Sequence, residues 1–112
     1  MKRSQPWDAV IIGGGIAGLS AAIYLARAKR DTLVIDDGKS LARWEPDVQN
    51  YLGFPDGIAG KELLERGREQ ARHYGAQFQD DFVEELRRAP ANIFHVIGRD
   101  AVAEARRIVL AT

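Results

Sequence analysis

Three glycines near the start of the chain, Gly13, Gly15 and Gly18, have the spacing G-x-G-x-x-G, which can bring a diphosphate against bare backbone. Gly13 would allow a tight turn, Gly15 would let a pyrophosphate come close because it has no Cβ atom, and Gly18 would let a helix pack closely on a strand. A helix beginning at this turn would add unpaired N–H groups and the positive end of its dipole. The spacing therefore indicates a phosphate-binding turn.

An acidic residue follows at the distance expected for the sugar of the same ligand. Asp36 comes directly after the apolar run 32–35, at close to the ~20-residue spacing of an acid that accepts hydrogen bonds from an adenosine ribose. Asp37 is a second candidate, which would either assist at the ribose or solvate the turn after it. We prefer Asp36 because it directly follows the apolar run.

The surrounding elements decide whether this glycine pattern is a binding site or only a turn. The run 9–12 is short, apolar and rich in β-branched residues, which predicts a buried parallel strand. Residues 16–28 favour a helix, and 32–35 predict a second strand. The alternative is a glycine-rich turn in some other α/β protein. The order strand, glycine turn, helix, strand and acid favours dinucleotide binding.

The middle of the chain is less regular. Residues 41–58 have no clear period, and their aromatics Trp44, Tyr51 and Phe54 predict a loop that packs either on the core or over a planar ligand. A second helix is predicted from about residue 60 to Tyr74, with Gly75 ending it. Its apolar face would contain Leu63, Leu64, Ala71 and Tyr74.

The second half predicts a change of architecture. Residues 76–79 read as a third strand, and the short segments that follow alternate as in an antiparallel meander, in which His95 would be a cross-strand surface residue. The last residues predict another buried parallel strand. The expected fold class is α/β, a Rossmann-like βαβ unit with a parallel sheet plus a small antiparallel β-meander. We expect one partial domain over 1–112: parallel part 7–79, meander about 81–106 and final strand 107–112.

Composition excludes several classes of function. The 112 residues allow one domain at most, and 16 Lys and Arg balance 16 Asp and Glu, so no net field favours nucleic acid or an anionic membrane. No apolar run is long enough to span a bilayer and no signal peptide is visible, which predicts a cytoplasmic protein. The absence of cysteine excludes disulfides and a Cys-x-x-Cys pair, and His73 and His95 lie too far apart to suggest a metal site. No side chain is a convincing general base, so no catalytic residue is assigned.

Several motifs, in order, carry a family resemblance over nearly the whole chain. The chain resembles the FAD-binding portion of thioredoxin reductase-like flavoproteins, which are oxidoreductases with two dinucleotide-binding domains. The matching segments are Asp8–Gly18, Val34–Asp36, Asn50–Ile58 with its Asn-x-x-Gly-Phe-Pro pattern, Gln70–Ala76 and Ile108–Thr112.

The resemblance implies a role for each matching residue. The pyrophosphate of FAD would lie on Gly13, Gly14, Gly15, Ile16, Ala17 and Gly18. Asp36 would hold the adenosine ribose, and the backbone of Val83 would meet the adenine. Asn50 would lie near the flavin or its ribityl chain, and Ala111 and Thr112 near the central part of the cofactor.

The resemblance also implies parts that this sequence does not contain. In the family an NAD(P)H-binding domain and the rest of the FAD domain follow, so we expect a truncated or split piece of an FAD-dependent, NAD(P)H-linked oxidoreductase, inactive alone. NAD(P)H is expected only for the missing domain. The alternatives are a non-catalytic dinucleotide-binding module and the NAD-binding domain of a dehydrogenase. An uncovered final strand would favour a homodimer or a complementing polypeptide.

Overall fold

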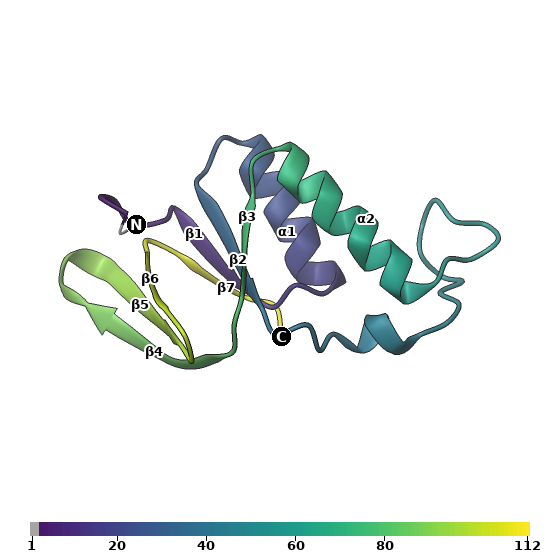
Figure 1. Ribbon diagram of the computed structural model, residues 1–112. Coiled ribbons are helices and arrows are strands. Elements are labelled where there is room, and N and C mark those ends of the chain that lie inside the picture. Colours follow the sequence, from purple (N-terminus) through teal and green to yellow (C-terminus); the bar gives the residue numbers. More distant parts are fainter. Residues whose placement is uncertain (1–2) are drawn as a thin grey trace.

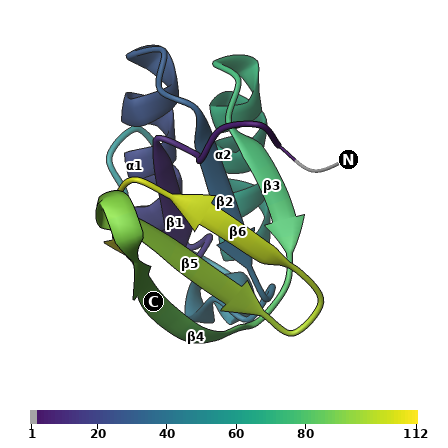
Figure 2. The same ribbon diagram turned by 90° about the vertical axis from the view of Figure 1, so that its left-hand side faces the viewer.

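The computed structural model describes residues 3–112, which form three layers (Figure 1). A four-stranded parallel sheet lies in the middle, two helices cover one face, and a three-stranded antiparallel sheet lies against the other. Figure 2, turned by 90°, shows the antiparallel strands lying across the front of the parallel ones. This is the α/β class predicted from the sequence, with the expected meander as a separate layer.

The parallel sheet has the strand order β3-β2-β1-β7, and the meander has the order β4-β5-β6. The chain passes from β3 through the whole meander before it returns to β7 beside β1. The elements in chain order are β1 (Ala9–Ile12), α1 (Ile16–Arg27), β2 (Thr32–Asp36), the 3-10 helix η1 (Leu41–Trp44), α2 (Gly60–His73), β3 (Gln77–Asp80), β4 (Val83–Ala89), the 3-10 helix η2 (Pro90–Asn92), β5 (Ile93–Gly98), β6 (Val102–Ala105) and β7 (Ile108–Leu110).

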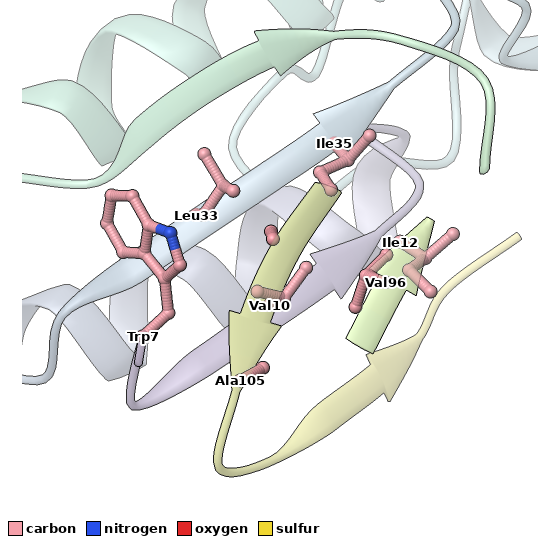
Figure 3. Close-up of a cluster of buried hydrophobic side chains, with 8 residues drawn as sticks. Trp7, Val10, Ile12, Leu33, Ile35, Val96 and Ala105 are labelled. Carbon is pink, nitrogen blue, oxygen red and sulfur yellow. The ribbon is translucent and has the colours of Figure 1, made fainter. Parts of the chain in front are cut away.

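Alternation along β1 and β2 divides the core into two clusters. Val10, Ile12, Leu33 and Ile35 face the meander, where they pack with Trp7, Val96, Ala103 and Ala105 (Figure 3). Ile11 and Val34 face the helices and pack with Ala22, Ala26, Ala71 and Ala76. Small side chains on the helices let them lie close to the sheet, and both faces of the central strands are dry, as expected for a parallel sheet.

The predicted elements are confirmed in order, and the differences concern exposure. The final strand β7 pairs in parallel with β1 as predicted, but it is a half-buried edge strand, and Leu110 is 68% exposed. Among the described residues it has a strand neighbour on one side only, so its other edge is unpaired. Of the residues expected on the apolar face of α2, Leu63, Leu64 and Ala71 are buried, whereas Tyr74, at the end of the helix, is 41% exposed.

The segment between β2 and α2 is more ordered than predicted. It contains η1, a bridge between Val48 and Ile58, and an aromatic contact between Tyr51 and Phe54 with ring centroids 6.3 Å apart. Trp44 does not pack on the core, since it is 72% exposed. Figure 1 shows this segment extending past the end of α2 that begins at Gly60. In the described part of the chain, no helix is long and apolar enough to cross a membrane.

Candidate functional site

A cavity of about 500 Å³ opens at the carboxyl ends of β1, β2 and β7. In open α/β sheets this edge is where ligands bind. The cavity lies between the turn after β1, the segment after β2, the start of β4 and the last two residues. Its lining consists of Ile12, Gly13, Gly14, Gly15, Ile16, Ala17, Ile35, Asp36, Asp37, Lys39, Ser40, Leu41, Ala42, Asp81, Phe82, Val83, Ala111 and Thr112.

The glycine turn is tightly packed at its first and last glycines. Gly13 has φ +109°, and a Cβ atom there would overlap the carbonyl of Ala111. A Cβ atom on Gly18 would overlap the carbonyl of Gly13, so Gly18 lets α1 pack against the turn that follows β1. Gly18 therefore supports the cavity from behind and does not line it.

The N-terminus of α1 is open toward the cavity. Gly15 is the residue before the helix, and no side chain caps the first turn. Ile16 and Ala17, in that turn, line the cavity. A helix start without a side-chain cap presents free N–H groups and a positive dipole end, which is the environment that phosphate oxygens prefer.

The segment after β2 closes over this helix start. A Cβ atom on Gly15 would lie 2.9 Å from the Ser40 hydroxyl oxygen, so glycine here keeps room for both the loop and a ligand. Lys39 and Ser40 line the cavity, although the sequence analysis did not assign them to the site. The only signal for them was their place in a turn directly after the two acids.

Asp36 ends β2 and points into the cavity with 8% of its surface exposed. One carboxylate oxygen, Oδ1, accepts a hydrogen bond from the N–H of Gly14 at 3.1 Å, and the other, Oδ2, lies 3.5 Å from an Arg68 nitrogen. A Cβ atom on Gly14 would come within 2.7 Å of this carboxylate. The middle glycine of Gly13-Gly14-Gly15 is therefore required by Asp36, a role that the motif alone does not predict.

Asp81, a second buried carboxylate, connects the two sheets. It accepts hydrogen bonds from the N–H groups of Phe82, Asp100 and Ala101, and a Cβ atom on Gly98 would overlap it. Burial acts to raise the pKa of Asp81, but these hydrogen bonds outweigh it and hold the pKa below its usual value. Sequence reasoning did not single out Asp81, because two of its partners, Asp100 and Ala101, lie in the β5–β6 turn, 19 and 20 residues away.

The predicted cofactor-binding residues converge on this cavity, with two exceptions. Besides Gly18, only Asn50 lies outside the lining, in the exposed segment before α2. Asp37 lines the cavity but is exposed, and its carboxylate accepts a hydrogen bond from the N–H of Lys39 at 3.0 Å. Val83, Ala111 and Thr112 also line the cavity. Within residues 3–112, no cluster of side chains could hold a metal ion.

Three features meet at one edge of the sheet: the glycine turn, the open start of α1 and the acid at the end of the second strand. Together they define a Rossmann-type dinucleotide-binding unit. Comparison with known proteins agrees: residues 8–45 match the family model of the FAD dependent oxidoreductases. Thioredoxin reductase of Mycolicibacterium smegmatis is 38% identical over 115 residues, which cover 99% of this chain and 36% of that protein.

Solved structures give the same family. The atypical thioredoxin reductase TRi from Desulfovibrio vulgaris Hildenborough superposes with a TM-score of 0.87 at 41% identity, over 97% of this chain and 36% of that one. A thioredoxin reductase from Gloeobacter violaceus has a TM-score of 0.90 at 31% identity, over 96% and 34%. The chain belongs to the thioredoxin reductase-like FAD-dependent oxidoreductases and corresponds to their FAD-binding portion. It spans about a third of the length of these relatives.

Proposed function

We propose that this chain binds FAD through the ADP half of the cofactor, and that it serves an NAD(P)H-linked flavoprotein oxidoreductase. The observation that carries the proposal is the cavity, in which the open start of α1, Asp36 and Val83 face one space of about 500 Å³. Family membership supports FAD as the ligand. The nicotinamide that would supply the electrons belongs, in this proposal, to a separate domain, as the family resemblance implies.

In this proposal each part of the cavity has one task. The N–H groups after Gly15 bind the pyrophosphate, and Lys39, which also lines the cavity, adds a positive charge. Asp36 accepts hydrogen bonds from the adenosine ribose, and the backbone of Val83 contacts the adenine. The bound flavin supplies the redox chemistry, while these residues bind and orient it.

Two further contacts belong to this proposal, one at the end of the chain and one in the segment before α2. Ala111 and Thr112 line the cavity beside Gly13, so we assign them to the central part of the cofactor. Asn50 is exposed and outside the cavity lining. Its proposed contact with the flavin or ribityl chain therefore requires the ligand to extend well beyond the cavity, toward the segment before α2.

The competing function is NAD binding, because NAD and FAD share the ADP part that Asp36 would contact. Calorimetric titration of the chain with FAD, NAD and ADP separates the two. We expect FAD to bind more tightly than NAD, and the purified complex to be yellow with a flavin absorbance band. Preference for NAD, or no uptake of either cofactor, would overturn the FAD assignment.

Gly15→Val tests the phosphate contact. The new side chain would meet Ser40 and fill the space before α1, so affinity for FAD and ADP should collapse while the fold persists by circular dichroism. Leu52→Val is the matched control, because Leu52 is 94% exposed and outside the cavity. Unchanged affinity in Gly15→Val would contradict the proposed site.

We also propose that another polypeptide, either a second copy or a complementing chain, covers the open edge at β7. A groove of about 280 Å³ there is lined by Leu86, Phe94, Ile108, Leu110 and two arginines, Arg87 and Arg88. Unpaired strand edges with apolar side chains favour association. Light scattering over a concentration series should show self-association that Leu110→Lys reduces. A clean monomer at high concentration, with and without added partner, would contradict this.

A further inference from the structure

Arg68, in the middle of α2, reaches across the carboxyl ends of two neighbouring strands. One guanidinium nitrogen lies 3.5 Å from Asp36 Oδ2 at the end of β2, and another lies 3.6 Å from Asp80 Oδ1 at the end of β3. The guanidinium carbon also lies 4.6 Å from the centre of the Phe78 ring. With 23% of its side chain exposed, Arg68 is held by three partners and is not a freely solvated surface cation.

The two acids beside Arg68 differ in burial. The Asp80 side chain is 88% exposed, so its ion pair is well screened and contributes little. The Asp36 side chain is 9% exposed, so its charge is poorly solvated and needs a partner. Asp36 and Asp80 are also paired in register on adjacent strands, which places two negative charges side by side. Arg68 lies between them and offsets their repulsion.

The carboxylate of Asp36 is fixed from two sides. Gly14 donates its N–H to Oδ1 and brings bare backbone against the group, and Arg68 contacts Oδ2 from α2. An ionised carboxylate has about four acceptor positions, so one partner on each oxygen leaves positions for two ribose hydroxyl groups. The torsion of the carboxylate, and therefore the direction of those free positions, depends on both partners.

We propose that Arg68 is a positioning residue for the sugar end of the site: it holds the Asp36 carboxylate in the orientation that accepts the hydroxyl groups of an adenosine ribose. This inference rests on the proposed function. Arg68 does not line the cavity, so it acts through Asp36 and not by direct contact with the ligand.

The experiment compares ADP with 2′,3′-dideoxy-ADP, measured by calorimetry on the wild-type chain and on Arg68→Gln. We expect Arg68→Gln to weaken ADP binding roughly five- to tenfold and to leave dideoxy-ADP binding nearly unchanged, because the dideoxy ligand has no hydroxyl groups for Asp36. Arg68→Lys keeps the charge but has no planar guanidinium to reach both acids, so its affinity for ADP should lie between those of the wild type and Arg68→Gln.

Arg72→Gln is the matched control. Arg72 lies one turn further along α2 and also stacks on Phe78, at 4.8 Å, but forms no ion pair with Asp36 among the described residues. The Arg72→Gln variant should bind ADP and dideoxy-ADP with the affinities of the wild type. In an Asp36→Ala background, Arg68→Gln should have no further effect on ADP binding.

Each outcome decides one question. An equal loss for ADP and dideoxy-ADP in Arg68→Gln would show a general structural role and overturn the inference, as would no loss for either. If Arg68→Gln fails to fold, Arg68→Lys gives the same comparison. A wild-type chain that binds neither FAD nor ADP would instead overturn the proposed function.

Discussion

Two buried carboxylates at one edge of the sheet, Asp36 and Asp81, show how similar local geometry can serve different purposes. Each lies against a glycine that has no room for a Cβ atom, Gly14 for Asp36 and Gly98 for Asp81. Each accepts backbone N–H hydrogen bonds. They also lie close along the backbone, since the N–H of Asp81 donates to the carbonyl of Asp36 at 3.1 Å.

The difference between them is the number of partners. Asp81 accepts three backbone hydrogen bonds and one from Gln79, so its acceptor positions are filled by the chain itself. Asp36 has one backbone donor and one ion pair, and it faces the cavity with acceptor capacity left over. A carboxylate saturated by its own chain holds the fold, and an unsaturated one can hold a ligand.

The largest effect predicted from this comparison is on ligand binding. Asp36→Ala should weaken ADP binding about 100-fold, because two hydrogen bonds to a charged acceptor are lost, and should change the melting temperature little. Calorimetry and thermal unfolding measure the two quantities. Asp37→Ala is the control and should lose far less affinity, because Asp37 is exposed and already accepts the Lys39 N–H. Equal losses of ADP affinity in Asp36→Ala and Asp37→Ala would contradict the assignment of Asp36 as the ligand-binding carboxylate.

Asp81→Ala should have the opposite profile. Three backbone N–H groups lose their acceptor, and the link between the β5–β6 turn and the end of β3 is broken, so the melting temperature should fall by several degrees or more. Ligand affinity should fall only as far as the folded population falls. Asp100→Ala, at an exposed position in the same turn, is the control. If both variants melt alike, Asp81 does not hold the fold.

The two glycines give a smaller and paired test. A Cβ atom on Gly14 would push the Asp36 carboxylate, so Gly14→Ala should weaken ADP binding roughly tenfold with a modest loss of stability. Gly98→Ala would push Asp81 and should lower the melting temperature while affinity per folded molecule is kept. The same titration and melting experiments apply to both variants. If Gly14→Ala mainly lowered the melting temperature and Gly98→Ala mainly weakened ADP binding, the roles assigned to Asp36 and Asp81 would be contradicted.

The smallest effect is on the dependence of stability on pH. The pKa of Asp81 is lowered in the folded state, so the folded chain binds fewer protons than the unfolded chain as this group titrates. Its stabilising contribution is therefore present above the unfolded pKa of about 3.9 and is lost as pH falls through the lower folded pKa. The stability difference between wild type and Asp81→Asn should shrink with acidification in urea titrations from pH 7 to 3. A difference independent of pH would exclude this linkage.

Much of the fold could be predicted because its signals are local. The apolar run before Gly13, the spacing of the three glycines and the strand ending at Asp36 each occupy a few consecutive residues, and each is found as predicted. The exposure of Tyr74 and Trp44, and the extent to which the last strand is covered, could not be predicted in this way. An apolar side chain favours burial, but whether it is buried depends on whether another element of the fold covers it.

The sequence by itself determined the order of the elements and the end of the sheet where the site would lie, because strand, turn and helix preferences act between near neighbours and parallel strands place their carboxyl ends together. Only the tertiary structure decided which carboxylate is left free for a ligand. Gly14 and Arg68 reach Asp36 across 22 and 32 residues, and Asp100 and Ala101 reach Asp81 across 19 and 20. Such contacts depend on how the layers pack, and no local pattern of residues records them.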